Sequence, residues 1–420
     1  MHRRTFLKAL PVTLASFASG CALARIDPKH VLVRSDRITS MEQESEILSR
    51  AKLSWTDDGK VRVLMTRGNA YERGYQHGKL LRREVQENIG YIYEQALRKF
   101  HFKDLFDEAY ERMRPFIPQD YVDEMHGLAH GARMPLEVIH NVHVLADIGE
   151  WGGKKQIKKA VREMMEGTLA TSCSNIGASG SATVDGHLYT VRILDWGLHK
   201  ISKLHEFPLI HVSYPEKGVP NANIGWVGYL GAISGMNAAH ITLGEMGYRD
   251  PDGETLSGIP MPFMMREVLT HAENLADVRR IIHDAVGTCS YVFMMSDGKT
   301  NEAEMYVKDR SRFVTFKPGA DVHDTKEEIP GIKDIVYGGH YNEKMTAVLT
   351  ENHGKLSPEV FMKLIPGIAM PSNFQNVIYD STGLRFWVSN AASKDEWAAS
   401  QPYTYFDLAD FLKRQKASRT

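Results

Sequence analysis

The chain has 420 residues, of which 43% are hydrophobic, and a formal net charge of −1 at pH 7. This length and apolar content suffice for a large buried core. The near-neutral charge gives no case for a nucleic-acid partner or an acidic membrane surface. After the N-terminal segment, no apolar run approaches the roughly 20 residues of a transmembrane helix.

The N-terminus has the layout of an export signal. Arg3-Arg4-Thr5-Phe6-Leu7-Lys8 is typical of a twin-arginine signal, and a short, mildly apolar run follows. Ala18-Ser19-Gly20-Cys21 then resembles a lipoprotein cleavage box, although the usual leucine is absent. We expect residues 1–21 to direct export to the periplasm or cell envelope. Cys21 is either a lipid attachment site, which would anchor the protein to a membrane, or lies near an ordinary cleavage site.

Residues 22–172 are expected to be mostly helical. Apolar residues recur every three or four positions over residues 81–100, a spacing that predicts an amphipathic helix. Further helices are expected over residues 105–113 and 121–132, and another starting at Met134-Pro135-Leu136 with Pro135 in its first turn. A lysine-rich polar stretch over residues 152–167 then leads to Cys173. It is either a solvated face or an exposed linker.

Residues 173–420 are expected to be mainly strands. Cys173 opens a strand-like stretch, and Asp185-Gly186 predicts a two-residue hairpin loop with Val184 facing His187. The returning strand ends at Asp195, so this carboxylate is expected at the hairpin end that carries Cys173.

Further hairpins and one long helix follow. A turn is expected at Met236-Asn237 before a strand over residues 241–245, and a helix over residues 262–284. Hairpins are expected around Asp297-Gly298 and around Gly383. Hairpins interrupted by helices favour an α+β sandwich with packed sheets and outer helices.

Cys173 is the candidate nucleophile, and a cysteine nucleophile needs a base or a lowered pKa. A papain-like dyad would place the cysteine at a helix N-terminus, which this strand context disfavours. Cleavage between Ser172 and Cys173 would instead free an α-amine with a pKa of about 7.7–8 to take the thiol proton. Asp195 could hold the amine, and Arg192 could steady the thiolate or a substrate carboxylate.

Strand geometry restricts this arrangement. Arg192 and Asp195 are three apart, so a regular strand would point them to opposite faces. Asp195 must therefore lie past a bulge or at the strand end, and Gly177 or Gly180 could supply a compensating bulge.

Several other residues have a structural interpretation. Cys289 is expected to be a buried small residue, with no disulfide to Cys173. The spaced histidines lack the acidic companion of a zinc protease motif, so packed or solvated roles are expected and no metal or cofactor. The methionines are expected in the core, with an acyl-chain pocket as the alternative. These residues are His126, His130, His140 and His143, and Met261, Met264 and Met265.

Several motifs together resemble the isopenicillin-N acyltransferase-like group of cysteine N-terminal nucleophile (Ntn) hydrolases. Three of them surround the candidate nucleophile, at residues 173–175 (CSN), 182–186 (ATVDG) and 192–196 (RILDW). The others are residues 67–78 (RGNAYERGYQHG), 124–132 (EMHGLAHGA) and 231–237 (GAISGMN). The resemblance extends over most of residues 66–400.

The resemblance implies an αββα fold, self-cleavage before Cys173, and a thioester acyl-enzyme resolved by water or an amine. By position, Cys173, Arg192 and Asp195 inherit the catalytic roles, and Glu245 falls where related amidases place an acid. The family's oxyanion asparagine commonly precedes a His-Tyr-like pair, whereas here Gly339 precedes His340-Tyr341. Asn342 and His340 are therefore the substitute candidates.

The expected function is hydrolysis of a linear amide bond, or transfer of its acyl group, with a small-molecule N-acyl substrate. The alternatives are a lipid hydrolase of the phospholipase B-like kind and a non-catalytic envelope binding protein with the same fold. Fold alone does not name the substrate, because this superfamily acts on many amides.

Overall fold

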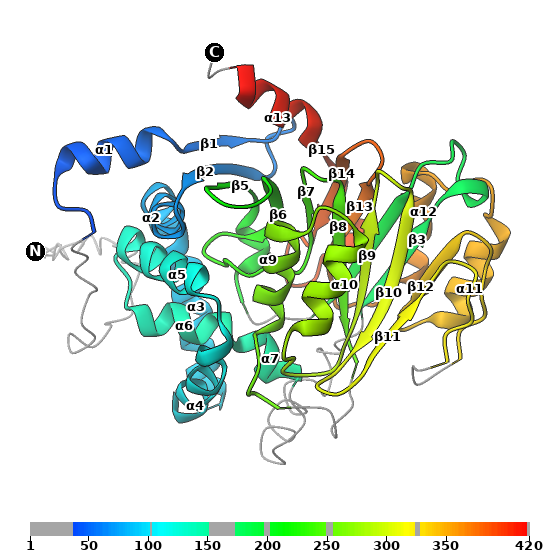
Figure 1. Ribbon diagram of the computed structural model, residues 1–420, viewed down its shortest axis with the longest axis horizontal. Coiled ribbons are helices and arrows are strands. Elements are labelled where there is room, and N and C mark those ends of the chain that lie inside the picture. Colours follow the sequence, from blue (N-terminus) through cyan, green and yellow to red (C-terminus); the bar gives the residue numbers. More distant parts are fainter. Residues whose placement is uncertain are drawn as a thin grey trace, which may run out of the picture. The chain divides into compact units, whose positions relative to one another are not determined.

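Two stacked β-sheets with helices on their outer faces form the centre of the structure (Figure 1). The computed structural model describes residues 37–100, 103–150, 173–196, 202–248, 255–323 and 328–417. All of these belong to one compact unit of the chain, Leu32–Thr420. The predicted signal with Cys21, the lysine-rich stretch and Ser172 lie outside the described residues.

Within the described ranges the first sheet has nine strands in the order β1-β2-β5-β6-β7-β8-β9-β10-β11. The strands are β1 (Lys52–Trp55), β2 (Arg62–Gly68), β5 (Pro208–Pro215), β6 (Asn221–Trp226), β7 (Gly235–Asn237), β8 (Ile241–Gly247), β9 (Tyr291–Asp297), β10 (Glu302–Lys308) and β11 (Phe313–Phe316). The central strands are buried along nearly their whole length, as expected for a sheet covered on both faces.

Six described strands form the second sheet, in the order β12-β3-β4-β13-β14-β15. They are β3 (Ser174–Ala178), β4 (Tyr189–Asp195), β12 (Ile335–Gly338), β13 (Asn373–Asp380), β14 (Arg385–Asn390) and β15 (Thr404–Asp407). All neighbouring pairs in this sheet are antiparallel. Strands β3 and β4 face β8 and β9 of the first sheet.

Helices cover the outer face of each sheet. Helices α9 (Met261–His271) and α10 (Leu275–Asp284) contact the first sheet, and α12 (Pro358–Ile368) contacts β4 and β13 of the second. Helix α11 (Asn342–Glu351) packs against α12. The layers therefore run helix, sheet, sheet, helix, which confirms the predicted αββα sandwich.

The N-terminal region is helical, and it also adds two strands to the first sheet. The four predicted helices are α3 (Arg82–Phe100), α4 (Lys103–Met113), α5 (Gln119–Ala132) and α6 (Leu136–His143), the last beginning just after Pro135. Three further helices were not predicted: α1 (Met41–Ser49), α2 (Ala70–Leu80) and α7 (Leu145–Glu150). Strand β2 pairs in parallel with β5 over seven residue pairs. The region before Cys173 and the region after it thus share one sheet.

Glycines bring two of the sequence motifs together in this region. Helix α2 carries Gly74 and Gly78, and α5 carries Gly127 and Gly131. A Cβ at Gly74 would lie 2.0 Å from the Glu124 carbonyl oxygen, and one at Gly127 would lie 2.0 Å from that of Tyr71. The two helices can approach this closely only because these positions lack side chains.

The Cys173 hairpin is real, but its predicted two-residue loop is wrong. Strand β3 ends at Ala178 and β4 begins at Tyr189, and their register pairs Ser174 with Ile193. A short 3₁₀ turn over Gly180–Ala182 occupies part of the connection. Gly186 does have a positive φ of 77°, so the Asp-Gly turn forms inside a longer loop.

Two other elements differ from prediction. The helix expected over residues 262–284 is two helices, because Asn274 caps α10 by accepting a hydrogen bond from the Asp277 amide. The turn expected at Met236-Asn237 is the short strand β7. Within the described part of the chain, no helix is both long enough and apolar enough to cross a membrane.

Candidate active site

Cys173 lies at the beginning of β3, at the end of the inner face of the second sheet. A Cβ at Gly177 would lie 2.7 Å from the Ala303 Cβ of β10, so this face of β3 points toward the first sheet. Cys173 shares the face because alternate residues of a strand point the same way. Cys173 is 8% exposed, and among the described residues neither it nor Cys289 is in a disulfide.

Arg192 reaches Cys173 from the neighbouring strand. The hydroxyl of Thr190 lies 2.9 Å from that of Thr242 on β8, so Arg192, two residues further along β4, also points between the sheets. Its guanidinium donates to Glu245 Oε1 at 2.5 Å and to the Ile193 carbonyl at 2.7 Å. It also hydrogen-bonds the Cys173 thiol.

Burial dominates the protonation of the thiol. Desolvation raises the pKa of Cys173 to about 12, and the charge and hydrogen bond of Arg192 oppose this rise. Glu245 and Asp195 add to the rise because they are carboxylates. The groups that act most on the thiol thus include no histidine, and in the uncleaved chain the thiol is protonated at neutral pH.

Asp195 lies at the end of β4, opposite a bulge. The pairing of β4 with β13 shifts between Asn373 and Gln375, whereas β3 pairs regularly with β4 from Ser174 to Ala178. The bulge is therefore on β13, and the expectation of a bulge at Gly177 or Gly180 is wrong. The expected placement of Asp195 at a strand end is correct.

The Asp195 carboxylate is only half satisfied. Oδ1 accepts a hydrogen bond from Asn373 Nδ2 at 2.9 Å, while Oδ2 is buried with no hydrogen-bond partner in the part of the chain that the structure describes. Burial raises the pKa of Asp195 to about 7, partly offset by hydrogen bonding from Asn373 and from the Met370 backbone. A donor placed at Oδ2 would relieve this cost.

Glu245 is buried, with 6% of its surface exposed, and forms an ion pair with Arg192. The preceding residue on β8, Gly244, leaves space for the Arg192 side chain because it has no Cβ. A Cβ at Gly244 would lie 2.3 Å from Asn175 Oδ1 and 3.0 Å from Arg192 Cδ. The glycine is therefore required for Arg192 to pass between the sheets.

The segment with the oxyanion candidates runs beside the start of β3. Gly338 pairs with Asn175, and the His340 amide donates to Ser174 Oγ at 3.4 Å. Continuing this register places His340 across from Cys173. Asn342, at the first position of α11, uses Oδ1 to accept the Gly339 amide at 2.9 Å, so its carbonyl end stabilises the turn.

Two asparagines of the site were not predicted. Asn373 binds Asp195, but the sequence suggested a strand only from Asn376 onward. Asn175 is part of the CSN motif and 1% exposed, yet neither atom of its side-chain amide has a partner among the described residues. For Asn373, the available sequence signal was the cluster of amide side chains at the start of β13. For Asn175, it was a polar residue two positions after the cysteine, on the same face of the strand.

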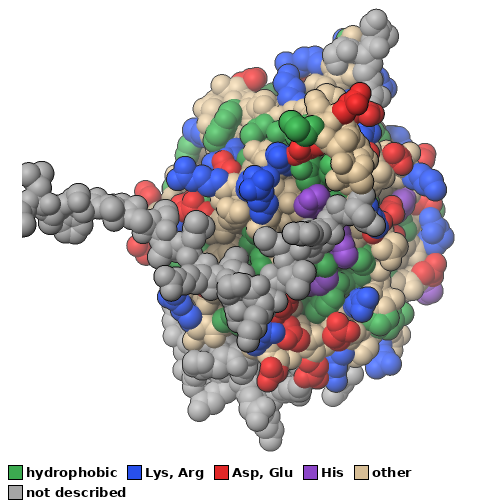
Figure 2. All heavy atoms as spheres, turned by 90° about the vertical axis from the view of Figure 1, so that its left-hand side faces the viewer, with side chains coloured by type: hydrophobic (Ala, Val, Ile, Leu, Met, Phe, Trp, Pro, Cys, Tyr) green, Lys and Arg blue, Asp and Glu red, His purple; other side chains and the backbone are tan. Residues whose placement is uncertain are grey.

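The histidines on α5 and α6 pack against the helical region. His130 Nδ1 lies 2.5 Å from the Tyr71 hydroxyl, and His143 accepts from the Leu230 amide at 2.8 Å. His126 and His140 line a hollow of about 420 Å³ between α4, α5 and α6, and histidines gather on this side in Figure 2. Across the described ranges, no three His, Cys, Asp or Glu side chains are placed to hold a metal ion.

The three methionines at the start of α9 are buried in the main core, with 3% or less of their surface exposed. Core packing is therefore their observed role. They are Met261, Met264 and Met265.

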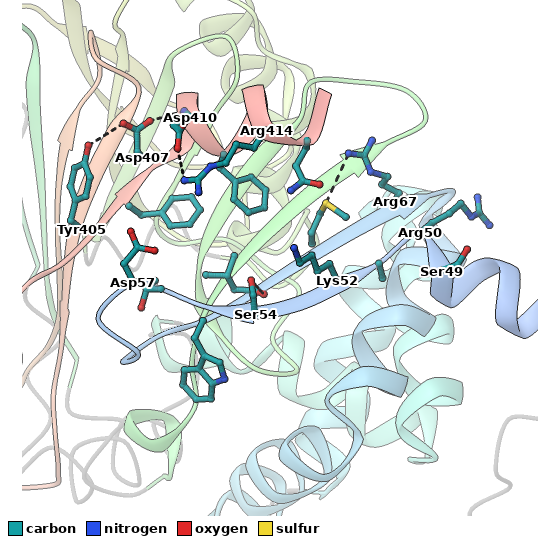
Figure 3. Close-up of a pocket in the computed structure, with 18 residues that line it drawn as sticks. Ser49, Arg50, Lys52, Ser54, Asp57, Arg67, Tyr405, Asp407, Asp410 and Arg414 are labelled. Carbon is teal, nitrogen blue, oxygen red and sulfur yellow. Dashed lines mark hydrogen bonds and ion pairs between the residues drawn. The ribbon is translucent and has the colours of Figure 1, made fainter. Parts of the chain in front are cut away.

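A separate cavity of about 900 Å³ lies between the β1–β2 hairpin and the C-terminal helix α13 (Leu408–Ala417) (Figure 3). Lys52 and Arg67 line one part and Asp57 another, while Arg414 is paired with Asp410. Four strands separate β1 from β8 in the sheet order. At about 4.8 Å per strand this cavity is remote from Cys173.

No family model matches the chain. Its sequence is similar to two proteins of Dictyostelium discoideum, Protein dcd1B (22% identity over 324 residues) and Protein dcd1A (24% over 319 residues). These alignments cover 69% and 67% of this chain but 59% and 66% of the relatives, so the chain spans about three fifths to two thirds of their length. An uncharacterized protein of Archaeoglobus fulgidus is 22% identical, with 86% of this chain and 69% of that protein covered.

Solved structures with partial similarity include two hydrolases. The Caenorhabditis elegans ortholog of N-acylethanolamine-hydrolyzing acid amidase has a TM-score of 0.39 and 10% identity, covering 56% of this chain and 100% of that one. A mutant of conjugated bile acid hydrolase from Clostridium perfringens has a TM-score of 0.36 and 10% identity, covering 57% of this chain and 93% of that one.

Proposed function

We propose that this protein is an exported cysteine Ntn hydrolase of the isopenicillin-N acyltransferase-like kind, which cleaves its own chain before Cys173 and then acts on a linear amide bond. The observation that carries the proposal is a buried carboxylate, Asp195, close enough to Cys173 for its charge to act on the thiol. One carboxylate oxygen of Asp195, at the end of the strand beside Cys173, is buried with no partner among the residues that the structure describes. An α-amine on Cys173 would supply the missing donor.

The αββα fold and the site support self-cleavage chemistry. In the maturation step the Cys173 sulfur attacks the carbonyl carbon of Ser172, the C–N bond breaks, and the amide nitrogen becomes the α-amine of Cys173 by gaining a proton. Water then hydrolyses the resulting thioester, which leaves a carboxylate on Ser172 and restores the thiol.

The freed amine then acts as the base, since no histidine is among the groups that act most on the thiol. With a pKa of about 7.7–8 in an ordinary setting, the amine accepts the thiol proton as sulfur attacks the substrate carbonyl. Asp195 holds the amine, and Arg192 stabilises the thiolate through its charge. The amine then protonates the leaving nitrogen, and water or an acceptor amine attacks the thioester to release the acyl group.

The proposal also covers the group that accepts the acyl chain and the class of substrate. We propose water as the acceptor and a small N-acyl compound as the substrate, with acyl transfer to an amine as the variant reaction. Export through residues 1–21 and lipid attachment at Cys21 belong to the same proposal. Labelling cells with a radioactive fatty acid would mark the wild type and not Cys21→Ala.

Mass spectrometry of the purified protein tests the maturation step. The wild type should yield a fragment beginning at Cys173, and Cys173→Ala should remain one chain. Cys289→Ala is the matched control, because this cysteine is also buried and in no disulfide with a described residue but lies outside the site. An uncleaved wild type with full amidase activity would contradict the mechanism.

A substrate screen separates the reaction classes. Hydrolysis of N-acyl amides, but not of phospholipid esters, by the wild type and not by Cys173→Ala is the expected result. Release of fatty acid from phospholipid alone would favour the lipid hydrolase. A chain inert toward both classes, whose cellular effect survives thiol alkylation, would favour a binding protein.

A further inference from the structure

Asn175 is a buried polar side chain of the site that the reaction steps above do not use. It lies two residues after Cys173 on the same inner face of β3 and is 1% exposed. Its amide oxygen and nitrogen both lack partners among the described residues. Leaving such groups buried costs about 1–3 kcal/mol each, so an unpartnered amide here requires an explanation.

The strand register places Arg192 directly beside this amide. Asn175 and Arg192 are paired across β3 and β4, where side chains of opposite residues begin about 4.5–5.5 Å apart. Both side chains lie against Gly244, because a Cβ added at this glycine would collide with Asn175 and crowd Arg192. The two side chains therefore share one small space between the sheets.

Arg192 has one matching unpartnered group. Its terminal nitrogens bind Glu245 and the Ile193 carbonyl, and the guanidinium hydrogen-bonds the Cys173 thiol. Its Nε is buried with no hydrogen-bond partner found among the described residues. Nε–H is a donor in the plane of the guanidinium, so a partner there sets the orientation of the whole group. An amide oxygen is a suitable acceptor.

We propose that Asn175 is a positioning residue: its amide oxygen accepts the Nε–H of Arg192 and holds the guanidinium against the Cys173 sulfur when the thiolate or acyl-enzyme forms. The proposal rests on the proposed function for its purpose, since it assigns Asn175 to the same site. Arg192 is then held by Glu245 at a terminal nitrogen and by Asn175 at Nε.

Asn175→Leu separates positioning from a structural role. Leucine has a similar size and removes the unpartnered amide, so the melting temperature should stay the same or rise. The Arg192 guanidinium loses its partner at Nε, so the pKa of the Cys173 thiol should rise by about one unit. The measured rate of iodoacetamide alkylation of Cys173 at pH 7 should then fall about tenfold. Asn175→Ala is a second variant with the same expected shift if leucine does not fit.

The control is Asn221→Ala. Asn221 is also buried, and its amide oxygen has no partner among the described residues. It is the first residue of β6, level with the start of β8 and away from Glu245. Its loss should leave the alkylation profile of Cys173 unchanged. A change as large as that of Asn175→Leu would overturn the assignment.

A double-mutant cycle tests the route through Arg192. In an Arg192→Met background, Asn175→Leu should add nothing to the thiol pKa, because the group it positions is gone. Additive shifts, or a wild-type pKa in Asn175→Leu and Asn175→Ala, would refute the positioning role. These titrations work on cleaved or uncleaved chain, so an intact wild type would count against the proposed function and not against Asn175.

Discussion

Asp195 should limit the stability of the uncleaved chain, so Asp195→Asn is expected to stabilise it while abolishing activity. The comparison is made in the Cys173→Ala background, where neither protein can be cleaved. Burial raises the pKa of Asp195 from 3.8 to about 7, a shift of about three units that corresponds to about 4 kcal/mol. Asparagine removes this cost but leaves a buried amide nitrogen at the Oδ2 position, which costs about 1–3 kcal/mol. The net gain is about 1–3 kcal/mol, or roughly 1–4 °C in melting temperature for a chain of this size.

The dependence on pH gives the decisive measurement. A carboxyl whose pKa is raised by folding costs nothing below its unfolded value near 4, and its cost grows as pH rises and is complete above about pH 7. Melting curves of Cys173→Ala and of the double variant with Asp195→Asn should therefore diverge from pH 4 to pH 8. The unsatisfied Oδ2 is the source of the cost, so a gain of equal size at both pH values would refute the reasoning.

Other predictions concern packing around the site and between the two parts of the chain. Gly244→Ala should displace Arg192 and lower activity at least tenfold, because the new Cβ would lie 2.3 Å from Asn175 Oδ1. The control is Gly90→Ala on α3, where an added Cβ would meet nothing beyond its own helix within 4 Å. This variant should leave activity unchanged in the same assay. Arg266→Met should destabilise the fold by about 3–5 kcal/mol in chemical denaturation, since Arg266 pairs with buried Glu124; an unchanged midpoint would contradict this. After cleavage the two fragments should co-elute in gel filtration and separate only in denaturant, because β2 is paired with β5.

Local patterns in the sequence predicted much of the architecture. Apolar spacing located α3, α4 and α5, and turn residues located the hairpins β9–β10 and β13–β14, because these signals depend only on neighbouring residues. The loop of the Cys173 hairpin was mispredicted for the same reason. Asp185-Gly186 favours a two-residue loop locally, but pairing of β4 with β13 and β3 with β12 imposes a register that leaves a longer connection.

The sequence by itself determined that Cys173, Arg192 and Asp195 come from two consecutive strands and that the cysteine follows a possible cleavage site. Only the tertiary structure decided how the three meet. The bulge opposite Asp195 lies on β13, which is about 180 residues away along the chain. Glu245, which pairs with Arg192, comes from the other sheet. Gly244, which lacks a side chain, leaves the space that Arg192 needs to reach it. Such contacts depend on the stacking of two sheets, a long-range arrangement that no local pattern specifies. The same stacking buries Asn175 beside Arg192.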